Sequence, residues 1–320
     1  MENYVTLFDS NFLAQGIALH KSMEKHCSGE YTLWILCVND RAYEVLSNLQ
    51  LSNVRLLKLS KLETPELKAV KVGRSKGEYC WTLTPFAPRF VFEAAPEVQR
   101  VTYIDADMWF MGSPKKIFRE FDESKKNVLI TECAYSPEHD QTATAGKFAV
   151  QFMIFDRNNG EVVRKWWEER CLEWCYARHE NGMFGDQKYL DDWEALFSEY
   201  VHVFSNKKLI VAPWNATKYS YGSACLWHFH GLRINNSDDE LRIFIGDYYL
   251  PKVVKEYVYD RYFIDLMYAI KLMEKNDFHH ENQAVYSPLS FLSLLMRKIR
   301  RNIRDYLKVC QEYEVVRKNN

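Results

Sequence analysis

Two aspartates, Asp105 and Asp107, follow the apolar run Val101 to Ile104 with a single alanine between them. In an extended chain, residues i and i+2 point to the same face, with α-carbons about 6 to 7 Å apart, so both carboxylates can hold one cation. Hard divalent cations such as Mn²⁺ and Mg²⁺ prefer carboxylate oxygens and often complete their coordination shell with substrate phosphates. The pair therefore predicts a metal that binds a diphosphate. The alternative is a turn, because aspartate is common where a strand ends.

A second group of candidate ligands lies far along the chain. The stretch Leu226 to Gly231 alternates like a strand and places His228 and His230 on one face. One imidazole and two carboxylates from distant strands would form an open metal site that keeps positions free for phosphate oxygens. The alternative for the histidines is a packed polar surface. The two motifs together favour the metal site over either structural alternative.

The segments that carry these motifs alternate between short apolar runs and helical patterns. Strands are expected at 4–8, 31–38, 54–57, 101–104, 128–131 and 148–155, and helices at 12–26, 41–49, 84–95 and 161–177. This alternation is typical of βαβ units and predicts an α/β fold with a mainly parallel sheet flanked by helices. Ligands of such sheets bind beyond the carboxyl ends of the strands, which is where Asp105 and Asp107 fall.

Composition narrows the class of protein. The chain has 320 residues, 47% of them hydrophobic, which is enough for one sizeable core or for a main domain with a smaller appendage. The net charge of -1 gives no overall attraction to nucleic acid, so no nucleic-acid partner is expected. Eight cysteines without a CxxC pair indicate reduced thiols. We find neither a basic leader with an apolar core nor an apolar run of membrane length, so a cytoplasmic protein is expected.

Four motifs in this order resemble glycosyltransferase family 8, the retaining nucleotide-sugar transferases with the GT-A (Rossmann-like) fold. They are Phe8-Asp9-Ser10-Asn11-Phe12, the Asp105/Asp107 pair, Gly185-Asp186-Gln187-Lys188-Tyr189-Leu190, and the histidine stretch ending at Gly231. The resemblance covers roughly residues 3–235. The blocks 78–86 (EYCWTLTPF), 184–193 (FGDQKYLDDW) and 212–215 (APWN) are similar to a bacterial subgroup of that family.

The resemblance implies a role for each matching residue. Phe8, Asp9 and Asn11 would bind the nucleoside, and Arg233 would reach the diphosphate. Asp105, Asp107 and His228 would bind Mn²⁺ or Mg²⁺. Asp186 and Gln187, beside the anomeric carbon, would be the catalytic residues. For Asp186 the alternative is a helix cap, because a carboxylate after Gly185 can satisfy free backbone N–H groups.

Four further residues are weaker candidates for the nucleotide-sugar site. Arg89 would meet the phosphates unless it faces solvent on its helix. Trp214 and Asn215 would line the sugar pocket, although a tryptophan after a strand also fits a core position. His230 would contact phosphate, with polar packing as the alternative.

The chain departs from the resembled family on the strand that follows the aspartate pair. Where the family has an asparagine and then a glycine, this chain has Ala149 and Gln151. A glycine at this position leaves room for the sugar, so Gln151 is expected at the sugar site. Its larger side chain would change the usual pose of the donor or acceptor there. This departure motivates the alternative of a non-catalytic relative that binds a nucleotide sugar or glycan.

The sequence pattern changes toward the end of the chain. From about Leu250 the pattern becomes helical, so we expect a GT-A domain over 1–250 and a helical extension over 251–320. Within it, residues 287–310 are predicted to form a basic amphipathic helix that starts at Ser287-Pro288. Such a helix can lie on an anionic membrane surface, here the inner face of the cytoplasmic membrane. The alternative is a helix that packs its apolar face on the main domain.

These observations together predict a metal-dependent glycosyltransferase. The resemblance implies a UDP-sugar donor, retention of configuration, and a glycan or lipid-linked acceptor in polysaccharide or lipopolysaccharide assembly. A third class, sugar nucleotidyltransferases, is disfavoured because no glycine-rich basic phosphate loop lies near the N-terminus.

Overall fold

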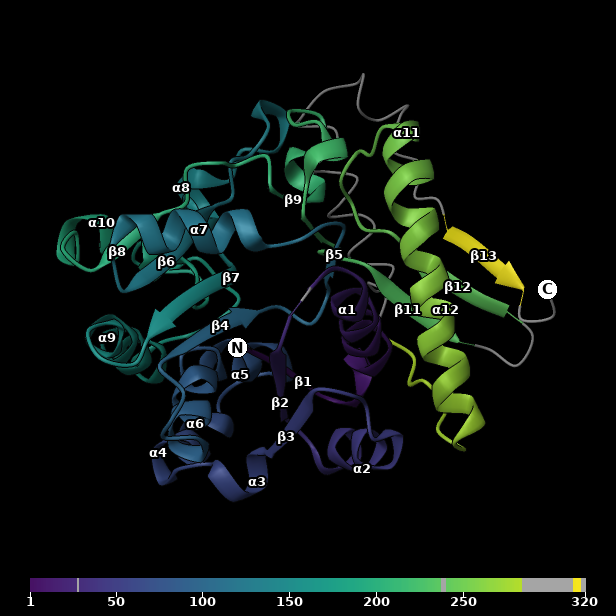
Figure 1. Ribbon diagram of the computed structural model, residues 1–320, viewed down its shortest axis with the longest axis horizontal. Helices are drawn as coiled ribbons and strands as arrows, with labels where there is room; N and C mark the ends of the chain where they lie inside the picture. The colour runs from purple at the N-terminus through teal and green to yellow at the C-terminus, as the bar shows by residue number, and fades with distance from the viewer. Residues whose placement is uncertain (28, 237–239, 284–312, 318–320) are drawn as a thin grey trace.

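A seven-stranded sheet forms the centre of the computed structural model, which describes residues 1–27, 29–236, 240–283 and 313–317 (Figure 1). The strand order is β3-β2-β1-β4-β7-β6-β8, with bounds β1 Glu2–Phe8, β2 Tyr31–Cys37, β3 Val54–Lys58, β4 Arg100–Ile104, β6 Val128–Glu132, β7 Phe148–Asp156 and β8 Val201–Val203. All neighbouring strands pair in parallel except β7, which runs antiparallel to β4 and β6. The predicted mixed, mainly parallel α/β sheet flanked by helices is confirmed.

Alternation along the strands sends side chains to two apolar layers. In β2, Leu33 and Ile35 enter one core and Trp34 and Leu36 enter the other. The first layer is covered by α1 Leu13–His26, α2 Asp40–Leu49 and α7 Lys115–Ser124. The second is covered by α4 Pro65–Lys71, α5 Lys76–Leu83, α6 Phe86–Ala94, α9 Gly160–Glu173 and α10 Trp193–Leu196. Two single-turn helices, α3 Leu59–Leu62 and α8 Thr142–Ala145, lie in connections.

A small second sheet positions the candidate site. It has the order β5-β10-β9, with β5 Met108–Phe110, β9 Ile210–Val211 and β10 Leu226–His228. The chain leaves β4 of the central sheet and enters β5 of the small sheet through the short segment that contains Asp105 and Asp107. β10 runs antiparallel to β5 and pairs His228 with Met108. The site therefore lies where the two sheets meet, at the carboxyl end of β4.

The C-terminal part departs from the predicted all-helical pattern. A third sheet contains β11 Arg233–Asn236, β12 Glu240–Phe244 and β13 Tyr313–Arg317, so the expectation that strands stop near residue 250 is wrong. Helix α11 Lys252–Val254 and a π-helical turn, Lys255–Tyr259, lead into α12 Asp260–Lys275. The sequence did not reveal β13, because a short strand becomes stable only through its pairing with β12.

Helix α12 lies beside α1 and packs on the main core (Figure 1). Its Asp265 accepts hydrogen bonds from Trp109 Nε1 at 2.9 Å and from Lys25 Nζ at 2.6 Å. The division of the chain at residue 250 stays a prediction. The amphipathic helix expected over 287–310 lies outside the described residues. Within the described ranges, no helix has the length and apolar character needed to cross a bilayer.

Candidate active site

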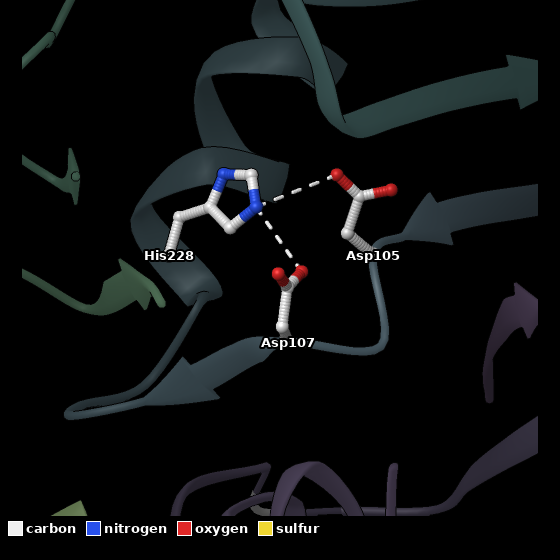
Figure 2. Close-up of side chains that lie close together, drawn as sticks. All are labelled: Asp105, Asp107 and His228. Atoms are coloured by element: carbon white, nitrogen blue, oxygen red, sulfur yellow. Dashed lines mark hydrogen bonds and ion pairs between the residues drawn. The ribbon is translucent and has the colours of Figure 1, made fainter. Parts of the chain in front are cut away.

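Three candidate metal ligands meet at the junction of the two sheets. His228 Nε2 lies 3.1 Å from Asp107 Oδ1 and 3.7 Å from Asp105 Oδ2, and Figure 2 shows the imidazole nitrogen facing both carboxylates. One ligand atom from each residue lies within 4.8 Å of the others. The structure thus brings together the three side chains that the sequence nominated for a metal.

Backbone hydrogen bonds fix the segment that carries the aspartates. The Asp105 N–H donates to Gln151 O at 3.1 Å, and the Met108 N–H donates to Asp105 O at 3.1 Å, which closes a tight turn. The Phe229 N–H donates to Asp107 O at 2.8 Å and ties this turn to the strand of His228. Hydrogen bonds to strands on both sides therefore hold the turn that carries the two aspartates.

The electrostatics of the cluster favour a bound cation. Burial raises the pKa of Asp105 to about 6, although the nearby His228 acts to lower it. Burial also acts to raise the pKa of Asp107, but His228 outweighs it and the pKa falls to about 2. Burial acts to lower the pKa of His228, yet the Asp107 carboxylate raises it above its usual value. The two acids gain from a positive charge between them, and their oxygens with one imidazole nitrogen suit Mn²⁺ or Mg²⁺.

A cavity of about 640 Å³ opens in front of this cluster. Of the other predicted site residues, it is lined by Phe8, Asp9, Asn11, Gln151, Asp186, Gln187, Trp214, His230 and Arg233. Residues from β1, β7, the 185–187 segment and β11 therefore converge on one space. A cavity of this volume, lined by apolar and aromatic side chains together with convergent polar groups, is typical of a small-molecule site.

Local hydrogen bonds shape the end of the cavity beside β1. Asp9 accepts hydrogen bonds from the backbone N–H of Asn11 at 2.9 Å and from its side-chain Nδ2 at 3.0 Å. The backbone oxygen of Asn11 in turn accepts from Gln283 Nε2 at 2.7 Å. The guanidinium of Arg233 lies 5.6 Å from the centre of the Phe12 ring, which holds this cation at the cavity wall.

Asp186 and Gln187 line the same cavity. Gly185 precedes them with a φ of +55°, a conformation that favours glycine and turns the chain toward the cavity. The Asp186 backbone oxygen accepts a hydrogen bond from Trp167 Nε1 at 2.8 Å, and Gln187 Nε2 donates to Ala145 O at 2.9 Å. Burial raises the pKa of the Asp186 carboxyl to about 7, and the negative charge of Asp105 adds to the increase. The following 3₁₀ turn, Lys188–Asp192, has Gln187 at its N-cap position, so Asp186 is not its cap.

Two predicted site residues lie away from the cavity lining. Arg89 on α6 forms ion pairs with Glu93 at 2.7 Å and Glu168 at 2.9 Å, so its guanidinium neutralises carboxylates of α6 and α9. Asn215 accepts from the Ala212 N–H at 3.0 Å and donates to Cys133 O at 3.0 Å, which makes it a buried support for its own turn. Neither residue is among those that line the cavity, and their predicted contacts with a nucleotide sugar stay predictions.

Trp214 and His230 lie together beside His228 in the cavity lining. Trp214 donates a hydrogen bond to Cys133 O at 2.8 Å and is largely buried, as expected for a core residue. It also lines the cavity, as expected for a pocket residue. His230 is exposed, with its ring centre 5.4 Å from that of Trp214.

Several lining residues were not nominated from the sequence. Tyr103 donates a hydrogen bond to Asp105 Oδ1 at 2.9 Å, and the i, i+2 relation on one strand was the signal that could have found it. Trp81 lines the cavity from α5, within the block 78–86. Tyr248 lines the cavity near His230 and accepts a hydrogen bond from Gln141 at 3.1 Å, a contact that no sequence pattern indicates.

Comparison with known proteins places the chain among relatives from Bacillus subtilis. YfnF, an uncharacterized protein, is 30% identical over 249 residues, which are 72% of this chain and 82% of YfnF. The chain belongs to the same family as YfnF. YfnD, also uncharacterized, is 28% identical over 227 residues, which are 69% of this chain and 71% of YfnD. No family model matches the sequence.

Solved structures identify the fold. The galactosyltransferase LgtC, in complex with donor and acceptor sugar analogs, has 14% identity and a TM-score of 0.50, covering 89% of this chain and 98% of LgtC. The glycosyltransferase GlyE from Streptococcus pneumoniae has 15% identity and a TM-score of 0.51, covering 86% of this chain and 62% of GlyE. At these identities the likeness concerns the fold, and it confirms the predicted GT-A fold.

Proposed function

We propose that the protein is a metal-dependent glycosyltransferase that takes its sugar from a nucleoside diphosphate sugar. The observation that carries this proposal is the convergence of Asp105, Asp107 and His228 on one point of a cavity at the carboxyl end of β4. Sheets of this kind bind their ligands at that edge. The GT-A fold, shared with LgtC and GlyE, supports the same class of reaction.

Breaking the bond between an anomeric carbon and a diphosphate places negative charge on the leaving phosphates and positive charge on the sugar ring. A divalent cation held by Asp105, Asp107 and His228 would supply Lewis acidity at the diphosphate oxygens. Arg233, fixed against Phe12 at the cavity wall, would donate forked hydrogen bonds to the same phosphates. Phe8, Asp9 and Asn11 would bind the nucleoside, which the resemblance indicates to be uridine.

Asp186 and Gln187 are the proposed catalytic residues. Their side chains line the cavity from the 185–187 segment, and Asp186 shares it with the metal ligands closely enough for Asp105 to raise its pKa. An ionised carboxylate and an amide oxygen next to the sugar would stabilise the positive charge that develops on the ring. Retention of configuration is proposed from the family resemblance, as is the polysaccharide or lipopolysaccharide-type acceptor.

A thermal-shift screen tests the donor site. The melting temperature would be measured with uridine, guanosine and other nucleoside diphosphates and with the corresponding nucleoside diphosphate sugars, each with and without Mn²⁺. A ligand that binds the folded state raises the melting temperature. We expect a uridine nucleotide to give the largest increase, and only when Mn²⁺ is present. No increase with any nucleotide would refute the assignment.

Slow donor hydrolysis separates the proposed enzyme from a non-catalytic relative, the alternative that Ala149 and Gln151 motivate. An active transferase is expected to release nucleoside diphosphate from the best-binding donor when no acceptor is present. Binding without any release of diphosphate, at all metal concentrations, would favour the non-catalytic relative.

A further inference from the structure

Gln151 forms hydrogen bonds with two of the three candidate metal ligands, Asp105 and His228. It lies on β7 of the central sheet, where its backbone oxygen accepts the Asp105 N–H at 3.1 Å. Its side-chain Oε1 lies 2.9 Å from Nδ1 of His228. Gln151 is 2% exposed and His228 is 5% exposed, so water competes little for this hydrogen bond.

The contact has a direction, because a carboxamide oxygen can only accept a hydrogen bond. Nδ1 of His228 therefore carries a hydrogen, so Nε2 is the nitrogen that can give up its proton and offer its lone pair to a cation. Nε2 is the atom that faces Asp107 Oδ1 and Asp105 Oδ2 (Figure 2). The glutamine thus selects the tautomer that a metal site at this position requires.

The contact also links side chains of the central and the small sheet. Gln151 belongs to the central sheet and His228 to the small sheet, whose strand pairing fixes the backbone of His228 but not the rotation of its ring. The ring of Trp214 lies against the imidazole at 5.3 Å between centres, nearly perpendicular to it. Trp214 limits the ring on one side, and Gln151 supplies the polar contact that sets which edge faces the aspartates.

We propose that Gln151 is a positioning residue that orients His228 and fixes its tautomer, and through it sets the affinity of the site for a divalent cation. This inference rests on the proposed function, because the cation belongs to that function. It gives a role to the residue that departs from the family pattern, and that role is distinct from contact with the sugar.

The test measures Mn²⁺ binding directly, from the electron paramagnetic resonance signal of the free ion, with no nucleotide or acceptor present. Gln151→Met removes the acceptor and keeps the approximate volume, so the dissociation constant for Mn²⁺ is expected to rise about 10- to 100-fold. Gln151→Glu keeps an acceptor for Nδ1–H and is expected to stay within about threefold of the wild type.

Asn3→Leu is the matched control. It also replaces a buried amide that accepts a hydrogen bond from an aromatic N–H, Trp34 Nε1 at 3.1 Å, but at the other end of the central sheet. It is expected to leave Mn²⁺ affinity unchanged. Asp107→Ala serves as the positive control and should weaken binding strongly.

Two measurements keep the inference distinct from the proposed function. If Asp107→Ala weakens Mn²⁺ binding and Gln151→Met does not, the role of Gln151 is overturned and the metal site stands. If neither variant changes binding, the metal site itself fails. In the wild type loaded with diamagnetic Mg²⁺, NMR should show a slowly exchanging Nδ1–H proton on His228. A protonated Nε2, or no such proton on Nδ1, would overturn the inference without any variant.

Discussion

Asp107 and His228 are joined by their backbones as well as by their side chains. The Phe229 N–H donates to Asp107 O at 2.8 Å. Phe229 directly follows His228, whose Nε2 lies 3.1 Å from the Asp107 carboxylate. The pairing of β5 with β10 extends this link along both strands. A site held in this way is preorganised, so substitutions of its ligands should change binding and charge more than the fold.

Asp105→Asn should have opposite effects on the apo protein and on metal binding. Because the pKa of Asp105 is raised to about 6 in the fold, its ionised form costs stability as pH rises through about 6. The amide removes this cost, so the variant without metal should melt at a higher temperature than the wild type at pH 7.5. It should also lose the increase in melting temperature that Mn²⁺ and uridine diphosphate produce together.

The exposed Asp122 on α7 is the control for this experiment, because its ion pair with Arg100 lies on the surface. Asp122→Asn should keep the response to metal and nucleotide. An Asp105→Asn protein that still responds to Mn²⁺ like the wild type would contradict the metal assignment.

Asp186→Asn should change both the pH profile of stability and the reaction. The carboxyl binds a proton in the fold up to about pH 7 but loses it near pH 4 in the unfolded chain. Its contribution to stability is therefore complete at low pH and is lost as pH rises through about 7. Calorimetry in EDTA should show a flatter dependence of melting temperature on pH for the variant.

The catalytic rate should increase with pH, whereas the contribution of Asp186 to stability decreases, because the proposed role of Asp186 needs the ionised carboxylate. The rate of donor hydrolysis by the metal-loaded wild type should rise with pH and level off at or below about pH 7. A bound cation offsets the negative charge of Asp105, which otherwise raises the pKa of Asp186. The variant should bind donor with similar affinity but turn it over at a low rate that is independent of pH. A variant with wild-type turnover would remove Asp186 from the mechanism.

Gly16→Ala should weaken nucleoside binding through Phe8. A Cβ on Gly16 of α1 would lie 2.4 Å from Cζ of the Phe8 ring, so the ring must move, and it lines the cavity. We expect a loss of about 1 to 3 kcal/mol in unfolding free energy, as for overpacked cores, together with a higher Kd for uridine diphosphate. Isothermal titration calorimetry and urea denaturation measure the two effects. Gly73→Ala, which has only ordinary contacts around its Cβ, should change neither; equal effects of both substitutions would exclude the Phe8 explanation.

The segment 287–310 should bring the protein to anionic membranes if the sequence-based prediction holds. Replacing Arg297, Arg300, Arg301 and Arg304 by Gln in the full chain removes four charges, each worth about 1 kcal/mol near lipid headgroups. Flotation with phosphatidylserine vesicles should show the wild type bound and the variant at least about tenfold less bound. Equal partitioning of the two forms would favour the alternative, in which the helix packs on the main domain.

Much of the site could be nominated from local sequence. The Asp105/Asp107 pair follows a buried strand, and the two-residue period predicted both carboxylates on one side, an arrangement that the structure achieves with a tight turn. The alternation of apolar runs and helical patterns likewise indicated the sheet and its ligand-binding edge. These properties depend on neighbours within a few residues, so the chain itself determined them.

Contacts between distant segments were decided only in the tertiary structure. For Arg89 the sequence left a phosphate contact and a solvent-facing position open, and the packing of α6 on α9 pairs it with Glu168, since helix periodicity does not tell which neighbour a face meets. Gln151 was expected in the sugar pocket and does line the cavity, but the sequence did not indicate that its side chain also contacts His228 across the two sheets. The physical reason is that a side chain's partner is set by how sheets and helices pack, and no spacing along the chain encodes that approach.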